Sequence, residues 1–408
     1  MYNLVNEPEH SLHRILTNRP PHVVQKCTLF STCGGFFISM PQKAYKFRLY
    51  PNKTQEISLS KTFGCVRLFW NHCVASFRDK VSEESTTEFR NSSDRDFMLD
   101  VSAAAIQQKH RDYLEFKKQK FNKSRKKQLG NPSFKKKNDK QSFRLPNQKF
   151  TLGEDRIRLE KIGWVKIVKD RDIPENAKFV NVTVSRNRAG QYFASILIDE
   201  SIEEKKKTGK GVGIDVGLEK FLTIDNGDFV ENPRYFGKNQ AKLARLQKIQ
   251  SNKVGSKKGQ KKSRRWLKMQ KKINKLYQTI TNQRDHFLHE VTTELVNNYD
   301  FIAIEDLAVQ EMMQDSYIAK SIADVSWARF FNFLEYKCQW YGKKLVKVDR
   351  YAPTSKTCSG CGYRFKGLTL EDRVVECPTC GSMDRDQNAA KNILALGVDS
   401  ALRTPRGV

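Results

Sequence analysis

The stretch that decides the fold lies near the middle of the 408-residue chain and reads Gly211-Val212-Gly213-Ile214-Asp215-Val216-Gly217-Leu218. It predicts a short apolar strand with glycines on both sides of one acidic residue. A turn, a second strand at 221–224 and an Asn226-Gly227 turn should follow. A carboxylate inside such a strand is costly unless it is paired or binds a metal ion. Other acidic residues that could meet Asp215 are therefore of interest.

Two later stretches supply acidic residues at the ends of predicted elements. Residues 300–307 read as a second apolar strand that ends in Glu305-Asp306, and residues 384–394 read as a helix with acidic residues in its first turn. Taken singly, each has a structural explanation, because acidic residues cap helices and interact favourably with the helix dipole. Asp384 in particular could be a capping residue.

Taken together, a strand Asp, a strand-end Glu and a helix-start Asp in this order are what a ribonuclease-H-like α/β domain brings to one point. Such a cluster suits two Mg²⁺ ions about 4 Å apart, one activating water and one stabilising the leaving oxygen. Hard oxygen ligands favour Mg²⁺ or Mn²⁺. The candidate catalytic residues are Asp215, Glu305 and Asp386, and Asp306 and Asp384 are the alternatives for the last two positions.

A second metal signal comes from four of the nine cysteines, which follow the pattern C-x2-C-x15-C-x2-C. They are Cys358, Cys361, Cys377 and Cys380. Four thiolates at this spacing predict a closed, structural Zn²⁺ site of the zinc-ribbon type, and a redox dithiol is the alternative. The ribbon lies between Glu305 and Asp386 in sequence, so we expect an insertion within the nuclease domain, beside the active site.

The net charge of +29 indicates a polyanionic partner, for which nucleic acid is the best candidate. A membrane partner is disfavoured, because no apolar run approaches 18 residues. No acidic residue occurs between Arg234 and Arg284, where helical spacing on both sides of a turn at 254–259 predicts a basic helical hairpin. A solvated helix face is the alternative, but an anionic partner better explains a surface that would otherwise repel itself. Basic and aromatic residues also alternate over 117–140.

The N-terminal half reads as strands interrupted by helices. Strands are expected at 44–50 and within 141–200, including a hairpin of 179–184 with 192–198, and helices at 55–77 and about 95–121. Together they predict a small β-barrel interrupted by a helical region. Residues 1–39 are expected to be a disordered extension, or to reflect a start placed upstream of Met40. The scattered remaining cysteines and the lack of a signal-peptide pattern fit a reducing cytosol.

The order of these motifs resembles the TnpB (OrfB) proteins of insertion sequences. The resemblance runs from Met40 to about Leu396 and rests on the four cysteines and on these segments: 45–51, 130–137, 213–217, 304–307 and 384–390. It implies an RNA-guided DNA endonuclease with a RuvC-type domain, related to type V CRISPR effectors. It also implies a β-barrel wedge domain split by a helical recognition domain, and it assigns the metal ligands to Asp215, Glu305 and Asp386.

The expected domains follow from the motifs and the resemblance together. They are a wedge barrel (40–54 and 141–206), a helical domain (55–140), a nuclease domain (207–352, including the hairpin 234–284), a zinc ribbon (353–383) and a C-terminal nuclease helix with tail (384–408). The expected partners are a guide RNA from the transposon end and a double-stranded DNA target, in the cytoplasm of a bacterial or archaeal cell and acting at the nucleoid. Two other functions stay open: a transposase that catalyses strand transfer, with 55–77 as a candidate helix-turn-helix, and a non-catalytic RNA-guided DNA-binding regulator.

Overall fold

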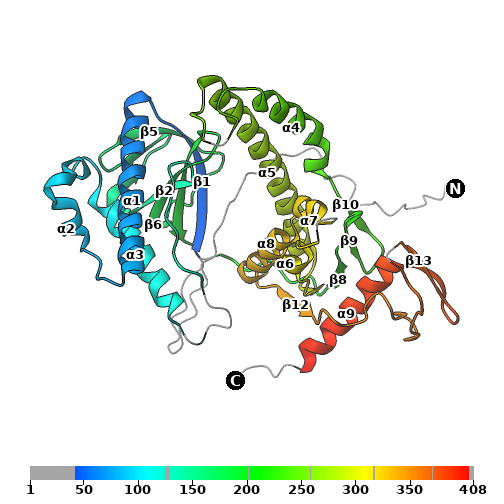
Figure 1. Cartoon of the computed structure of the whole chain (residues 1–408). Coiled ribbons are helices and arrows are strands. Elements are labelled where there is room, and N and C mark those ends of the chain that lie inside the picture. The colour runs from blue at the N-terminus through cyan, green and yellow to red at the C-terminus, as the bar shows by residue number, and fades with distance from the viewer. Residues whose placement is uncertain are drawn as a thin grey trace, which may run out of the picture. The chain divides into compact units, whose positions relative to one another are not determined.

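The structure is a computed structural model that describes residues 42–122, 124, 129–200, 202–257, 259–315, 318–369 and 371–403. The expectation for residues 1–39 lies outside the described residues. The described chain forms two compact units (Figure 1). One contains residues 42–200 and 249–278, and the other contains residues 202–248 and 279–403.

The first unit is built on a seven-stranded sheet with the order β2-β6-β7-β1-β5-β4-β3. Its strands are β1 (Gln42–Tyr50), β2 (Gln141–Pro146), β3 (Phe150–Leu152), β4 (Arg156–Leu159), β5 (Gly163–Val168), β6 (Lys178–Arg186) and β7 (Tyr192–Asp199). The predicted hairpin is confirmed as β6 and β7, and β1 pairs with both β7 and β5 across a long sequence separation. Closure of this sheet into a barrel stays a prediction.

The helical elements between β1 and β2 are α1 (Lys53–Asp79), α2 (Thr86–Asn91), the 3₁₀ helix η2 (Ser93–Met98) and α3 (Ala103–Lys120). The predicted helix at 55–77 is confirmed as α1, which begins with a capping box formed by Asn52 and Gln55. The prediction of one helix over 95–121 is wrong, because η2 and α3 are separate. Serine and aspartate side chains between 92 and 102 compete for backbone hydrogen bonds and favour such a break.

The second unit is built on a five-stranded sheet with the order β10-β9-β8-β11-β12. Its strands are β8 (Gly211–Asp215), β9 (Lys220–Ile224), β10 (Phe229–Glu231), β11 (Phe301–Glu305) and β12 (Lys344–Val348). Strands β8, β11 and β12 are parallel, whereas β9 and β10 are antiparallel to their neighbours. The two predicted strands that carry Asp215 and Glu305 are therefore confirmed, and they are neighbours. Strand β8 ends at Asp215, whereas we expected Asp215 inside the strand.

Helices cover both faces of the five-stranded sheet. The remaining elements are α4 (Tyr235–Ser251), α5 (Arg264–Asn298), α6 (Val309–Met312), α7 (Ala319–Val325), α8 (Trp327–Trp340), β13 (Val374–Cys377), β14 (Gly381–Asp384) and α9 (Arg385–Arg403). Ile214 and Ile304 pack in one core with α5 and α8, while Ala303 packs with Ile393 of α9. Because side chains alternate along a strand, the odd-numbered residues of β8 and β11 face α9.

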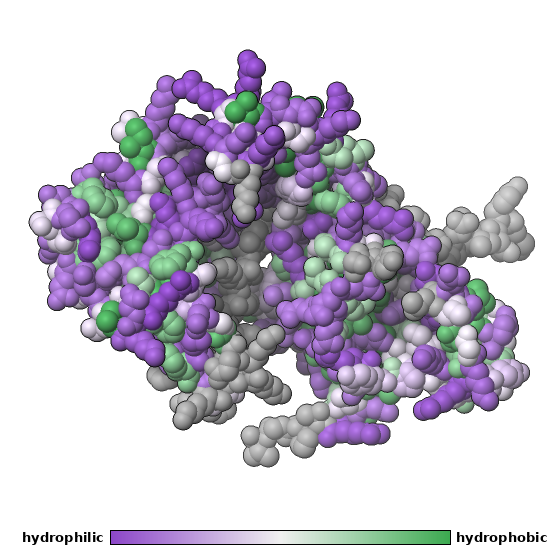
Figure 2. Space-filling model, in the orientation of Figure 1, coloured by the Kyte–Doolittle hydropathy of each residue, from purple (hydrophilic) through white to green (hydrophobic). Residues whose placement is uncertain are grey.

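The basic segment forms two helices, α4 and α5, joined by a turn at Gly255. Gln250 and Gln270 are hydrogen-bonded at 2.9 Å across this turn. Helix α5 continues past Arg284, the predicted end of the hairpin, to Asn298, because no glycine or proline interrupts it. Hydrophilic side chains predominate over α4 and the start of α5 in Figure 2. In the described part of the chain, every helix is too short or too polar to cross a lipid bilayer.

Candidate functional site

The register of β8 and β11 puts two of the predicted acidic residues side by side. Ile214 is the in-register partner of Ile304, and each strand ends one residue later, at Asp215 and Glu305. Neighbouring strands lie about 4.8 Å apart, and in-register side chains of a parallel pair point to the same face. Both carboxylates therefore point toward the face that α9 covers.

Helix α9 runs antiparallel to β8 and brings in the third acidic residue. The Leu394 side chain lies against Gly211, and Gly213 lies against the backbone of Ala390 and Leu394. Four residues of an α-helix advance about 6 Å, and two residues of a strand advance nearly the same distance. Ala390 lies against Gly213, so Asp386, four residues earlier on α9, is directed toward Asp215, two residues later on β8.

This close approach depends on the absence of a side chain at Gly213. A Cβ atom there would overlap the carbonyl oxygen of Ala390 and would lie 2.7 Å from the backbone nitrogen of Leu394. Helix α9 therefore rests directly on the backbone of β8. The glycine that marked the predicted strand is needed for helix packing.

The electrostatics of Asp215 agree with this arrangement. Burial, and then the negative charges of Glu305 and Asp386, raise the pKa of Asp215 well above its ordinary value, while Arg385 acts in the opposite direction. All three acidic residues keep part of their surface exposed. Of the three, Asp386 has an ion-pair partner, because its Oδ1 lies 3.5 Å from Arg385 Nη2, whereas no ion pair of Asp215 or Glu305 is found among the described residues. Such a set of carboxylates is suited to bind cations from solution.

The two alternative acidic residues have other partners. The carboxylate of Asp306 is 2.6 Å from Arg350 Nη2. Asp384 Oδ1 accepts a hydrogen bond from the backbone N–H of Gln387 at 2.9 Å, and its other oxygen lies 3.3 Å from Lys220 Nζ. Asp384 thus caps the N-terminus of α9, which was one of its two interpretations.

The three carboxylates do not lie as close together as the ligands of a single ion. Within the described ranges, the four cysteines form a group whose ligand atoms all lie within 4.8 Å of one another, and the three carboxylates do not form such a group. Ligands that belong to different ions of a pair, themselves about 4 Å apart, are more widely spaced than this.

Three polar residues beside the carboxylates were not found from the sequence. Thr354 Oγ1 donates a hydrogen bond to Glu305 Oε1, although Thr354 itself is only 4% exposed. Asn388 and Asn392 of α9 hold the segment that runs from Thr354 into the first cysteine pair. Their four-residue spacing predicts that the two asparagines lie on the same face of the helix, but it does not reveal which segment they contact.

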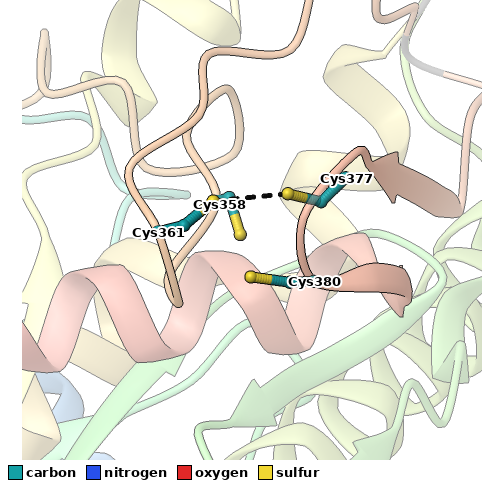
Figure 3. Close-up of side chains that lie close together, drawn as sticks. All are labelled: Cys358, Cys361, Cys377 and Cys380. Atoms are coloured by element: carbon teal, nitrogen blue, oxygen red, sulfur yellow. Dashed lines mark hydrogen bonds between the residues drawn. The ribbon is translucent and has the colours of Figure 1, made fainter.

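The four cysteines come together from two turns (Figure 3). All four Sγ atoms lie within 4.8 Å of one another, and those of Cys361 and Cys377 are 3.4 Å apart. Gly362 and Gly381, at φ +78° and +77°, allow the tight turns after Cys361 and Cys380. Zn–S bonds of about 2.3 Å in a tetrahedron separate the sulfurs by about 3.8 Å, so this donor set fits Zn²⁺.

The local hydrogen bonds favour a thiolate at Cys358 and a thiol at Cys380. Burial alone would raise the pKa of Cys358, but the N–H groups of Cys361 and Gly360 donate to its sulfur and lower its pKa to about 7. Hydrogen bonding to Cys361 and Cys358 raises the pKa of Cys380 to about 12. Without a cation, the cluster therefore retains protons that a bound metal would displace.

Replacing Cys358 and Cys361 together by serine is expected to lower the zinc content from about one ion per chain to less than about 0.1, because two ligands of a closed four-thiolate site are lost. Residues 353–383 should become sensitive to proteolysis. Elemental analysis of the purified chain measures the first effect. Cys338→Ala, at a buried cysteine outside the cluster, is the control. Unchanged zinc in the double variant would contradict the assignment.

Comparison with known proteins identifies the family. A curated relative from Streptomyces pristinaespiralis, named "Putative RNA-guided DNA endonuclease", is 34% identical over 374 residues, which cover 88% of this chain and 90% of the relative. The chain belongs to the TnpB family. A family model described as "Probable transposase" matches residues 182–316, and another described as "Cas12f1-like, TNB domain" matches residues 327–393. A relative from Escherichia coli K12, "Putative RNA-guided DNA endonuclease InsQ", is 31% identical and covers 87% of this chain and 92% of its own length.

One solved structure shares the fold of this TnpB-family chain. A Cas12f1 chain from a complex with its guide RNA and target DNA aligns with a TM-score of 0.52 at 15% identity, covering 87% of this chain and 99% of its own. The mixed α/β architecture is thereby confirmed. A model described as "Helix-turn-helix domain" matches residues 40–85. In the structure, however, most of this range is β1 followed by one unbroken helix, α1.

Proposed function

We propose that this chain is an RNA-guided DNA endonuclease that hydrolyses phosphodiester bonds with two divalent cations held by Asp215, Glu305 and Asp386. The names of the curated relatives support the guided endonuclease activity. The observation that carries the site is the meeting of three elements: β8 and β11 end side by side in acidic residues, and α9 brings Asp386 toward them.

The nuclease fold that we propose is RNase H-like, of the RuvC type. The strand order β10-β9-β8-β11-β12 supports it, with three parallel strands, two antiparallel ones and a helix on the face that carries the acidic residues. The domain boundaries given above stay part of this proposal. So do the assignment of the seven-stranded sheet as a wedge domain and that of the four-cysteine insertion as a Zn²⁺ ribbon.

Bound Mg²⁺ or Mn²⁺ would supply a hydroxide nucleophile and neutralise charge on the leaving oxygen. The protein supplies three carboxylates on rigid element ends, so that little reorganisation accompanies catalysis. Asp215, whose pKa is raised by the charges of both other carboxylates, would hold the cations together with them. Glu305 and Asp386 complete the ligand sets.

The basic surfaces are proposed to hold nucleic acid. Helix α4 and the first half of α5 carry many lysines and arginines and no acidic residue up to Arg284. When lysine and arginine side chains neutralise the phosphates of a nucleic acid, the counterions of those phosphates are released, and this release favours binding. We assign to it, and to the basic segment 117–140, the guide RNA from the transposon end. Base pairing to double-stranded target DNA would then supply sequence specificity.

Two other functions make different demands on the carboxylates. A transposase would use the carboxylates with a DNA 3′-hydroxyl as nucleophile, and the family description "Probable transposase" is its support. A non-catalytic regulator would need no carboxylate cluster, so the three converging acidic residues argue against it.

The test is to purify the full chain from cells that carry its transposon end and to sequence the RNA that copurifies. The complex is then incubated with Mg²⁺ and a plasmid bearing a guide-matched target, next to a plasmid with a scrambled target. Cleavage of the matched plasmid alone supports the proposal. Joining of transposon ends without bound RNA would establish the transposase, and guided binding without cleavage would establish the regulator.

A matched pair of variants separates the two acidic residues at the start of α9. Asp386→Asn removes a proposed metal ligand and is expected to slow target cleavage by at least about 100-fold, a loss of about 2.7 kcal/mol of transition-state stabilisation. Asp384→Asn should stay within about threefold of the parent, because asparagine also caps helices. Single-turnover cleavage rates measure both. The reverse order of effects would move the ligand to Asp384.

A further inference from the structure

A continuous set of hydrogen bonds joins the carboxylate cluster to the four-cysteine cluster. It begins at Glu305, whose Oε1 accepts a hydrogen bond from the hydroxyl of Thr354. Thr354 lies four residues before Cys358 and is almost fully buried. A buried hydroxyl that donates to one carboxylate oxygen restricts the rotation of that carboxylate and leaves its other oxygen for a metal ion.

The backbone of the same segment is held by α9. Asn392 Nδ2 donates to the carbonyl oxygens of Thr354 and Thr357, at 2.7 and 2.6 Å. One turn earlier, Asn388 Nδ2 donates to the Thr357 carbonyl at 2.8 Å, and Asn388 Oδ1 accepts from the Ser359 N–H at 2.7 Å. Asn388 is only 2% exposed, so these contacts take place away from water.

The two asparagines therefore hold both peptide groups that flank Cys358. Because Asn388 contacts a carbonyl on one side and an N–H on the other, its amide orientation is fixed by its partners. Asn388 also lies two residues after Asp386 on the same helix. The turn that presents Cys358 and the helix that presents Asp386 are thus parts of one hydrogen-bonded assembly.

We propose that Thr354 is a positioning residue for Glu305, and that Asn388 and Asn392 make this position depend on metal occupancy at the four cysteines. A metal ion at the cysteines holds residues 357–359 against α9, and α9 in turn holds the Thr354 backbone so that its hydroxyl reaches Glu305. Loss of that ion frees the segment and weakens divalent-cation binding at the carboxylates. The inference rests on the proposed function, because it takes Glu305 as a ligand of the catalytic ions.

The first experiment compares Thr354→Val, which keeps the side-chain shape but lacks the hydroxyl, with Thr354→Ser, which keeps the hydroxyl. Mn²⁺ binding to the full chain stripped of nucleic acid is followed by electron paramagnetic resonance, and zinc content is measured alongside. Removing such a supporting hydrogen bond typically weakens metal binding about 10- to 100-fold. We expect this loss for Thr354→Val with unchanged zinc, and Thr354→Ser within about threefold of the parent.

Ser355→Ala removes a hydroxyl from the neighbouring residue and is the matched control, with parental binding expected. Melting temperatures of all variants check that the fold is retained. Equal impairment of Thr354→Val and Thr354→Ser would assign Thr354 to packing and would overturn the positioning role. So would parental Mn²⁺ binding by Thr354→Val.

The second experiment tests the coupling. Zinc is removed from the parent and from Thr354→Val by a chelator, and Mn²⁺ binding is measured again. If zinc acts through Thr354, its removal weakens Mn²⁺ binding in the parent but adds little in Thr354→Val. Equal, additive losses in both proteins would overturn the coupling.

Glu305→Gln keeps failure of this inference distinct from failure of the proposed function. If Glu305→Gln still cleaves at the parental rate, the ligand assignment in the proposed function is wrong. If Glu305→Gln is inactive while Thr354→Val binds Mn²⁺ and cleaves like the parent, the further inference alone fails.

Discussion

Asp215→Asn is expected to abolish guided cleavage, slowing it by at least about 1,000-fold, while RNA and target binding stay at the parental level. The amide keeps the size of the side chain but removes the negative charge that would bind the cations. Metal-ion stabilisation of a phosphoryl transition state is worth several kcal/mol, and about 4 kcal/mol corresponds to this factor. The measurement is single-turnover cleavage of a matched plasmid, with gel-shift titration for binding. Parental cleavage by this variant would refute the metal site.

The same substitution is expected to stabilise the metal-free protein at neutral pH. Burial, with repulsion from Glu305 and Asp386, raises the pKa of Asp215 in the folded protein well above its ordinary value. The unfolded chain ionises this group near pH 4, so above that pH the folded state binds more protons than the unfolded state. The free energy of unfolding therefore falls as pH rises from about 4 toward the raised pKa. Asparagine is uncharged, so the variant does not lose stability in this way as the pH rises.

Urea denaturation of the metal-free parent and variant at pH 4 and pH 7 measures this effect. The variant should gain on the parent at pH 7, and the gain should shrink at pH 4. Asp399→Asn, at an exposed position on α9, is the control and should change neither value. A variant that is less stable than the metal-free parent at pH 7 would show that Asp215 is charged and paired in the folded protein.

Gly213→Ala is expected to impair both stability and cleavage. The added methyl group would overlap the Ala390 carbonyl and crowd the Leu394 backbone, so α9 must move away from β8. Inserting a methyl group into a packed core costs about 1–3 kcal/mol. The helix that moves also carries Asp386, so we expect cleavage to fall at least about 100-fold, because misplacement by about 1 Å can cost this much.

Gly130→Ala is the matched control for this substitution. Its added Cβ would have no atom within 4 Å, and its backbone is not in the left-handed region. Denaturant midpoints and cleavage rates should equal those of the parent. If Gly213→Ala is as stable and active as Gly130→Ala, the direct packing of α9 on the backbone of β8 is wrong.

The sequence predicted the elements that carry the acidic residues, and it did so for a physical reason. Apolar runs bounded by glycine or by turn residues mark buried strands, and both β8 and β11 have this pattern. Their neighbouring positions and register could not be predicted, because strand pairing depends on the whole sheet. The choice of Asp386 over Asp384 came from the resemblance alone. The structure adds that Asp384 is occupied as a helix cap.

Other features left no readable pattern. The hydrogen bonds of Thr354, Asn388 and Asn392 join residues far apart in sequence, and polar residues on a mostly polar segment resemble solvent-exposed ones. The length of α5 was underestimated, because its composition changes from basic to mixed although its backbone pattern continues. The cysteines were found easily, because their spacing is set by the geometry of tight turns around one ion.

The junction between β14 and α9 limits how the length of this chain can vary. Strand β14 ends at Asp384 and helix α9 begins at Arg385, so no linker residue separates them. One extra residue inside the first turn of α9 would rotate Asp386 by about 100° relative to the rest of the helix. Length changes in homologues or designed variants should therefore accumulate in the turn around Asp372, between the two cysteine pairs, and should be absent between Asp384 and Ala390.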